Sequence, residues 1–283
     1  MAKIEIPFLT GFTVKPLYIT SIGNITFTDG VNDVQPNQLQ CEAYGYNYNK
    51  ASGTCTISTY NSTYAGAVAN ENNKTFGKRN VTELGTNNTL IMGEGNIVRG
   101  LSRNNIITGT NNQIANGVNN ANISGTLGET TADNSIVIGG NAGSDNLGER
   151  QSIKLMYGVL TTTSGTVDSY LNNVTDSYFV IPDNTIMYFH ADIVAVRIGG
   201  TGAGSVGDYA SFVERGVVIN KSGTLSINRE RDAIKSSGTV TLWRPTAAVS
   251  GTNFLIDIRG AANVKIEWAA TISFTQIKTG VTL

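Results

Sequence analysis

The sequence predicts an all-β protein of three parts: an N-terminal β module, a short-period β-roll and a jelly-roll-like C-terminal β-sandwich. Charged residues make up only 14% of the chain while 32 of its 283 residues are glycine, which favours short strands and turns over helices. A glycine-closed unit recurs every eight residues between Asn80 and Gly140, and such a short period indicates stacked β-coils. The expected boundaries are 1–79, 80–140, a connector at 141–151, and 152–283.

The N-terminal part consists of short apolar runs separated by turns. Strands are expected at 3–6, 13–20, 24–28, 42–48 and 54–60. Tyr44, Tyr46 and Tyr48 alternate within one of these runs, so their rings share one face of the expected strand. Such a row can contact a carbohydrate or a protein, because each ring is flat and apolar with a polar tip. Packing within the module is the favoured interpretation.

Cys41 and Cys55 are the only cysteines of the chain. The segment 42–54 between them can fold as a hairpin that brings the two sulfurs together. Two cysteines without a neighbouring histidine cannot complete a structural zinc site, so no metal site is predicted. No cofactor is predicted either. Assembly in a reducing cytosol favours two free thiols slightly over a disulfide, which remains the alternative.

The repeat region places glycine on a register of eight at Gly77, Gly85, Gly93, Gly109, Gly117 and Gly125. Leu101 occupies the one slot in this series that lacks glycine. Eight residues are too few for a helical repeat but fit one strand and one tight turn, in which Gly and Asn supply the positive-φ positions. Two units would then form one coil of a flattened β-roll.

Side chains before each glycine are apolar on both faces of the expected strand. Ile91 and Val137 take one face, whereas their neighbours on either side take the other. A strand that is apolar on both faces is normally covered on both, so we expect one face in the roll interior and the other, which carries Ile91 and Val137, against further copies of the chain. The residues expected in this core and trimer contact are Leu90, Ile91, Met92, Ile106, Ile107, Ile114, Ile123, Ile136, Val137 and Ile138. A disordered linker is disfavoured because its apolar residues would not keep one phase.

Two runs carry a family resemblance. Residues 134–139, Asn-Ser-Ile-Val-Ile-Gly, and 88–93, Asn-Thr-Leu-Ile-Met-Gly, resemble the Asn-Ser-Val-Ala-Ile-Gly repeats of trimeric autotransporter adhesin heads, a motif also found in bacteriophage tail fibres and spikes. The resemblance implies a left-handed parallel β-roll, three copies of which pack into a homotrimer. Only the step from Gly125 to Gly139 has the fourteen-residue length usual in that family.

The segment after the connector alternates apolar and polar residues in longer runs. Strands are expected at 153–160, 178–181, 185–198, 211–219, 223–227, 239–243, 254–259 and 264–277. Runs of this kind between Gly, Asn, Pro and Ser turns are typical of a sandwich or jelly roll. The run Phe179-Val180-Ile181-Pro182 and the pair Trp268-Ala269 also resemble a C-terminal domain of phage tail fibres.

Candidate chemical motifs have structural interpretations that fit better. The pattern Gly202-Ala203-Gly204-Ser205-Val206-Gly207 lacks the following helix that a dinucleotide site needs, so a loop between strands is favoured. His190 shares a strand face with Asp192 but has no nucleophile elbow to serve, so a hydrogen-bonded strand histidine is expected.

Carboxylates also give no sequence signal of catalysis. The cluster from Arg229 to Asp232 is expected to be a solvated turn or an intersubunit ion-pair patch rather than a glycosidase site. The other carboxylates, Asp168 and Asp257 among them, are scattered singly. No catalytic residue is predicted, and the chain is expected not to be an enzyme.

Charge and hydropathy narrow the functional classes. A net charge of −1 offers no basic field for nucleic acid, and the chain has no apolar run that could insert into a membrane. The first residues lack the apolar core of a signal peptide, so synthesis in the host cytoplasm is expected, in contrast to an autotransporter. These features favour a structural component of a bacteriophage virion.

The expected function is host-receptor binding by a homotrimeric tail fibre or spike that also contacts other virion proteins. The receptor would be a host cell-surface glycan or protein, held by three sites on one rigid frame. Loop residues expected to contact it are Thr201, Ser205, Asp208, Arg229, Arg231 and Asp232. The alternatives are a capsid-attached head fibre or decoration protein without receptor binding, and a glycan-degrading tail spike.

Overall fold

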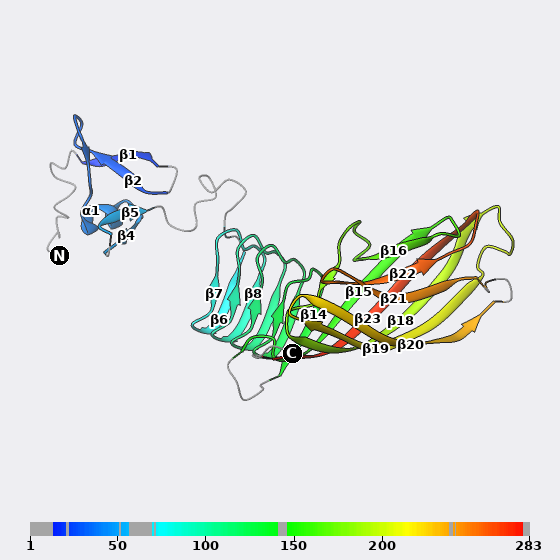
Figure 1. Cartoon of the computed structure of the whole chain (residues 1–283). Coiled ribbons are helices and arrows are strands. Elements are labelled where there is room, and N and C mark those ends of the chain that lie inside the picture. Colours follow the sequence, from blue (N-terminus) through cyan, green and yellow to red (C-terminus); the bar gives the residue numbers. More distant parts are fainter. Residues whose placement is uncertain are drawn as a thin grey trace. The chain divides into compact units, whose positions relative to one another are not determined.

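The computed structural model describes residues 14–20, 23–50, 52–56, 70, 72–140, 146–237, 240 and 242–279 (Figure 1). The chain divides into two compact units, residues 1–71 and residues 72–283, which are described separately. Nearly all regular structure is β. No described helix is long and apolar enough to cross a membrane.

The first unit combines a small antiparallel sheet, a short helix and a hairpin. The sheet has the order β1 (Lys15–Ile19), β2 (Ile25–Thr28) and β3 (Asp33–Val34). Helix α1 (Gln38–Ala43) follows, and β4 (Asn47–Asn49) and β5 (Thr54–Thr56) form the hairpin.

The structure corrects the expected strand at 42–48. Helix α1 ends at Ala43, and the strand β4 begins only at Asn47. The side chain of Asn37 accepts a hydrogen bond from the Gln40 backbone N–H, and the Gln40 side chain accepts one from the Asn37 N–H. This capping box fixes the start of a helix that has only six residues. The expected strand at 3–6 and residues 57–60 lie outside the described residues.

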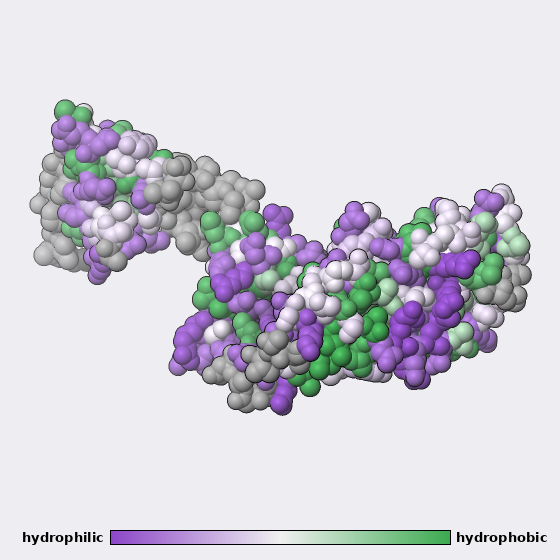
Figure 2. Space-filling model, viewed as in Figure 1, coloured by the Kyte–Doolittle hydropathy of each residue, from purple (hydrophilic) through white to green (hydrophobic). Residues whose placement is uncertain are grey.

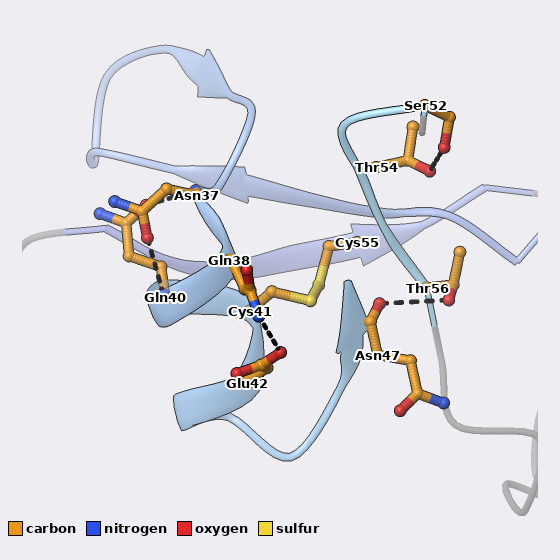
Figure 3. The surroundings of a disulfide bond; sticks show 10 residues. All are labelled: Asn37, Gln38, Gln40, Cys41, Glu42, Asn47, Ser52, Thr54, Cys55 and Thr56. Atoms are coloured by element: carbon orange, nitrogen blue, oxygen red, sulfur yellow. Dashed lines mark hydrogen bonds between the residues drawn. A yellow bond between two sulfur atoms is a disulfide. The ribbon is translucent and has the colours of Figure 1, made fainter. Parts of the chain in front are cut away.

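A disulfide joins α1 to the hairpin (Figure 3). Cys41 and Cys55 have Cα atoms 5.7 Å apart and are bonded, which corrects the expectation of two free thiols. Both side chains are buried with Ile25 and Phe27, so the crosslink lies within the core that the described residues of this unit form. The ring of Phe27 meets Tyr44 edge-on at 5.6 Å, but Tyr44 lies at the end of α1 and is 49% exposed, so it is not on the strand face that was expected for it.

The second unit begins with a β-solenoid of about four turns. One parallel sheet contains β6 (Lys74–Lys78), β8 (Leu90–Glu94), β10 (Ile106–Thr110), β12 (Asn122–Thr126) and β14 (Ile136–Gly140). The opposite sheet contains the short strands β7 (Val81–Thr82), β9 (Ile97–Val98), β11 (Gln113–Ile114) and β13 (Glu129–Thr130). Two eight-residue units thus form one coil, and β6 moves the start of the region from residue 80 to Lys74.

The solenoid interior is filled by the middle residue of each unit. Ile91, Ile107, Ile123 and Val137 are stacked in register and fully buried, and Ile114 contributes from the other sheet. The flanking residues point outward, and Met92, Ile106, Ile136 and Ile138 are exposed. Leu90 is half-buried.

Asparagine and glycine ladders hold successive coils at a fixed distance. The buried Asn112 donates to Oδ1 of Asn96, which donates in turn to Oδ1 of Asn80. A Cβ atom on Gly93 would lie 1.8 Å from the carbonyl oxygen of Gly109 in the next coil, so this row requires glycine. Buried amides are satisfied by the same position one coil away, which explains why asparagine recurs with the glycine.

The solenoid sheet continues into the C-terminal strands without a break (Figure 1). Strand β15 (Arg150–Thr161) pairs antiparallel with β14, and the order continues through β23 (Val264–Lys278), β18 (Thr185–Gly200), β19 (Tyr209–Lys221) and β20 (Thr224–Ser236). The pairing therefore changes from parallel to antiparallel between β14 and β15.

A second layer covers one face of these long strands. It consists of β16 (Thr166–Leu171), β22 (Asn253–Arg259), β21 (Arg244–Ser250) and the short β17 (Phe179–Val180). The ring of Phe254 in this layer lies 5.1 Å from both Phe189 and Phe274 of the long sheet. The more specific jelly-roll-like sandwich stays a prediction.

Three expected features of this region are corrected. Arg229 to Asp232 lie within β20 and not in a turn. Strands β16 and β21 were not expected, because one carries polar residues and the other contains Pro245. Of the expected strand 239–243, residues 239 and 241 lie outside the described residues, and Trp243 precedes β21.

The uncovered face of the long sheet carries apolar side chains from several strands. Met156, Val194 and Ile138 are 48%, 54% and 59% exposed and belong to β15, β18 and β14. Figure 2 shows hydrophobic side chains gathered over the strands nearer the solenoid, and hydrophilic ones toward β20. The outward apolar row of the solenoid thus continues onto the C-terminal strands.

Candidate functional site

Two aspartates stand directly opposite each other in the covering layer. Asp168 of β16 is the cross-strand partner of Asp257 of β22, and Thr246 of β21 is the next residue in that row. Residues opposed in this way have Cβ atoms about 4.5 to 5.5 Å apart on the same face of the sheet. Like charges at that spacing destabilise a sheet, so the pair is not explained by packing alone.

The environments of the two carboxyl groups differ. Partial burial, and then the charge of Asp168, raises the pKa of Asp257, and Arg229 opposes this effect. Asp168 instead accepts a hydrogen bond from the hydroxyl group of Tyr178 at 2.8 Å. Burial, and then this bond, raises the pKa of Tyr178 to about 12, so the phenol remains a donor at neutral pH. Asp257 consequently keeps its proton to a higher pH than a free aspartate does, which suits a proton donor, and the Tyr178 hydroxyl group fixes the position of Asp168.

A cleft begins at Tyr178, next to the pair. It has a volume of about 390 Å³ and lies between the last solenoid coil and the C-terminal strands. Glu129 and Lys278 form an ion pair of 3.4 Å in its wall, and Phe179 and Pro182 supply apolar surface. Its size and mixed lining fit a small part of a polar ligand such as a saccharide.

Another carboxyl group with a raised pKa, Glu214 of β19, is fully buried and contacts the covering layer. Burial raises its pKa, whereas the Ala247 N–H and the charges of Arg229, Arg231 and Arg244 oppose that shift. Its Oε2 accepts from the Ala247 N–H at 3.4 Å, and its Oε1 has no hydrogen-bond partner among the described residues. Glu214 cannot meet a ligand, because no part of its side chain reaches solvent.

The expected loop residues Thr201, Ser205 and Asp208 lie in the connection between β18 and β19. Asp208 accepts a hydrogen bond from the Ser205 N–H at 2.7 Å. The same loop wraps around the buried guanidinium of Arg197, which donates to the carbonyl oxygens of Gly200, Gly202 and Ala203. The glycine pattern therefore forms a loop around an arginine and no dinucleotide turn.

Arg229, Arg231 and Asp232 are not gathered with that loop. Arg229 stands opposite Gly216, which lies seven residues along β19 from Tyr209, about 23 Å in an extended strand. Arg231 faces the covering layer and donates to the Pro245 carbonyl at 3.0 Å, whereas Asp232 faces away and lies 3.4 Å from Arg215. The predicted receptor residues thus form two separate groups, and their role stays a prediction.

His190 is a strand histidine, as expected. Its Nε2 lies 3.1 Å from Asp192 Oδ1 on the exposed face of β18. Among the described residues, no group of three His, Cys, Asp or Glu side chains could hold a metal ion.

Sequence analysis missed the pair formed by Asp168 and Asp257. The only signal is that each is a lone carboxylate within a strand-like run, Thr-Val-Asp-Ser-Tyr-Leu and Phe-Leu-Ile-Asp-Ile-Arg. The pairing itself depends on the register of two strands that are distant in sequence, and no local pattern encodes that register.

Comparisons with known proteins give structural matches only. No protein-family model and no curated protein matches this chain. It is similar to the tailspike protein of Acinetobacter baumannii phage AM24, with 11% identity and a TM-score of 0.30 over 77% of this chain and 52% of that one. It is also similar to tailspike protein gp49 of A. baumannii bacteriophage Fri1, a capsular polysaccharide depolymerase, with 6% identity and a TM-score of 0.26 over 73% of this chain and 45% of that one.

The chain spans about half the length of these tailspike proteins. The Fri1 protein is an enzyme by its description, and this finding corrects the expectation that the chain is not one.

Proposed function

We propose that this chain is part of a tail-spike-type protein of a bacteriophage virion, and that its C-terminal strands cleave a host surface glycan at Asp168 and Asp257. The observation that carries the proposal is the direct opposition of these two carboxylates, of which one has a raised pKa. Paired carboxyl groups about 5 Å apart are the arrangement of retaining glycoside hydrolases.

The roles of the two groups follow from their surroundings. Asp257 is the general acid that protonates the glycosidic oxygen, because its pKa is raised. Asp168, held by the Tyr178 hydroxyl group, attacks the anomeric carbon and forms a glycosyl ester. Asp257 then takes a proton from water as the water displaces Asp168, so that both carboxyl groups return to their starting states.

Release of reducing ends from purified bacterial capsular polysaccharides tests the proposal. Asp257→Asn and Asp168→Asn should each lower the rate at least about a hundredfold, the usual size of an acid–base contribution. The matched control is Glu230→Gln, an exposed carboxylate of β20, which should retain full activity. Glycan binding without any release by the unaltered protein would show a binding spike instead.

The proposal includes a homotrimer that covers the uncovered apolar face. The exposed side chains form one row along a single sheet, from Met92 in the solenoid to Met156 and Val194 in the C-terminal strands. Continuous apolar surface of this kind is typical of an interface with another protein. A second copy is the simplest partner, because the face runs the length of the described unit.

Light scattering on the purified chain tests this assembly. A species of about three times 30.0 kDa that resists dilution supports it. Val194→Lys should lower the mass, because it places a charge in the proposed contact, whereas Asp232→Lys on the hydrophilic side should not.

A further inference from the structure

A row of arginines lies beside the carboxylate pair. Arg259 follows Asp257 by two residues on β22, and Arg244 of β21 stands directly opposite Arg259. Residues two apart on a strand share a face and are about 7 Å apart. The arginine row and the carboxylate row are therefore neighbours on one surface.

These arginines line a cavity of about 340 Å³ at the edge between β20 and β21. Arg231 and Lys235 of β20 complete a set of four cations, and none of the described residues in the lining is Asp or Glu. None of the four lies within 4.0 Å of a described carboxylate oxygen. The buried Glu214, which is the cross-strand partner of Arg231, is the carboxylate whose charge acts on Arg231, but it does not line the cavity. The lining itself thus carries four cations and no anion among the described residues.

Hydrogen bonds to backbone carbonyl oxygens hold the guanidinium groups of Arg231 and Arg259 in place and leave some of their N–H groups free for a ligand. Arg231 donates from one terminal nitrogen to the Pro245 carbonyl at 3.0 Å, and Arg259 donates from Nε to the Ser164 carbonyl at 3.3 Å. Each guanidinium has five N–H groups, so several remain for a ligand. Burial, and then the nearby charge of Arg244, lowers the pKa of Arg231, whereas the charge of Glu214 opposes this shift. An anion bound in the cavity would reduce the repulsion between Arg231 and Arg244.

The wall between the cations is apolar. Trp243 and Phe212 line the cavity and both pack against Trp268, at 6.0 and 6.3 Å between ring centroids. Leu242 lies at the rim and is 62% exposed. Sugar rings have apolar C–H faces that pack on such surfaces, and arginine binds a planar carboxylate through two parallel hydrogen bonds.

We infer that this cavity binds the carboxylate of an acidic sugar next to the bond that Asp168 and Asp257 act on. The inference rests on the proposed function and deepens it, because it assigns the charge of the glycan. The volume is at the lower end of the range of small-molecule sites, about 300 to 1,000 Å³, which suits one sugar unit.

Tryptophan fluorescence offers a direct test, because Trp243 lines the cavity and the only other tryptophan, Trp268, packs against it. The probes are glucuronate, galacturonate and mannuronate, each compared with its uncharged methyl ester. At least one free acid should give a saturable change with a Kd of about 1 mM or tighter, and its ester should bind at least tenfold more weakly.

Variants separate the cavity from general charge. Arg244→Gln and Lys235→Gln should each weaken binding of that acid severalfold, and the double variant at least tenfold. Arg215→Gln is the matched control, because Arg215 is an exposed arginine on the opposite face of β19. Circular dichroism and the melting temperature of each variant verify that it is folded.

Several outcomes would overturn the inference: no response to any free acid, equal binding of acid and ester, or equal weakening by Arg215→Gln. Tighter binding of inorganic phosphate than of every free acid would also overturn it. Failure of the proposed function is a separate result, because the Asp168→Asn and Asp257→Asn variants should still bind the acid. A chain that binds the acid but releases no reducing ends would retain the cavity and lose only the cleavage proposal.

Discussion

The solenoid and the C-terminal strands belong to one continuous sheet, yet they are held together over very different sequence distances. Ile91 pairs with Ile107, sixteen residues later, and every coil repeats that step or nearly so. Arg150 instead pairs with Ile277. The first arrangement makes each coil depend on its neighbours, whereas the second ties the ends of the C-terminal region to each other.

This difference predicts how each region responds to amino-acid substitutions. A coil position has equivalents one coil away, so the same residue can be tested at several places. A C-terminal core residue has no equivalent and contacts strands from distant parts of the chain. Substitutions should therefore act locally in the solenoid and throughout the C-terminal strands, except where a coil can no longer stack.

The largest expected effect is from Gly93→Ala, which would break the stacking of coils. The new Cβ atom would meet the Gly109 carbonyl oxygen at 1.8 Å, and backbone cannot move aside as a flexible side chain does. We expect a loss of more than about 5 kcal/mol, which is exceptional for one substitution. Urea unfolding followed by circular dichroism measures it.

Gly117→Ala is the matched control in the same solenoid. Gly117 also has a positive φ, of +75°, but a Cβ atom there meets nothing within 4 Å. Its cost should be only about 1 to 2 kcal/mol, the penalty of the left-handed conformation. Equal losses for the two variants would show that φ, and not stacking, requires glycine in the Gly93 row.

Phe254→Ala should disrupt the C-terminal strands as a whole. The ring contacts Phe189, Phe274 and Tyr157, so its removal leaves a cavity between the two layers. We expect a loss of about 3 to 5 kcal/mol. Hydrogen exchange should speed up in β15, β18 and β23 together while the coils before β12 keep their protection. Val180→Ala, at a half-exposed position nearby, should change little.

Glu214→Gln should make the stability of the C-terminal strands less dependent on pH. Because folding raises the pKa of Glu214, its carboxyl group favours the folded state fully only below its unfolded pKa, near 4.5. That contribution is lost as pH rises from the unfolded pKa through the higher folded pKa. The free energy of unfolding of the unaltered protein, relative to the variant, should fall across this range. A difference that stays flat across this range would contradict the burial effect.

The smallest effect is a gain, from Leu101→Gly. Leu101 has a φ of +60°, in the series where Gly85 and Gly117 stand one coil before and after. Relief of the left-handed penalty exceeds the added flexibility of the unfolded chain, so we expect a gain of up to about 1 kcal/mol. A melting temperature that falls would indicate that the exposed Leu101 side chain has a packing role.

The sequence predicted the solenoid well because its contacts are local. The eight-residue period predicted the strand and the turn, and alternation separated Ile91 and Val137 from their neighbours. The assignment of the two faces was wrong, because Ile91 and Val137 were expected at the contact with further copies and are buried in the solenoid interior, whereas Ile136 and Ile138 are exposed. Glycine slots and asparagine positions followed from positive φ and from ladders between coils. The expectation that two eight-residue units form one coil is confirmed by the step of sixteen from Ile91 to Ile107.

The candidate site could not be predicted in the same way. Asp168 and Asp257 meet only through the register of β16 with β22, which the packing of distant strands decides. The charged segment from Arg229 to Asp232 resembles a turn in sequence, although an edge strand such as β20 can carry such side chains. Helix α1 was missed because six residues are too few for a periodic signal.

The change of direction between β14 and β15 has a consequence for synthesis. Strand β15 pairs with β14, the last strand of the solenoid sheet. Its longer pairing is with β23, which ends at Lys278. A ribosome delivers the coils before that partner exists. Strand β15 can pair with β14 as soon as it has emerged, but most of its other edge has no partner strand until residue 278 has emerged. The interval during which this nascent chain can aggregate is set by the time needed to translate from β14 to β23.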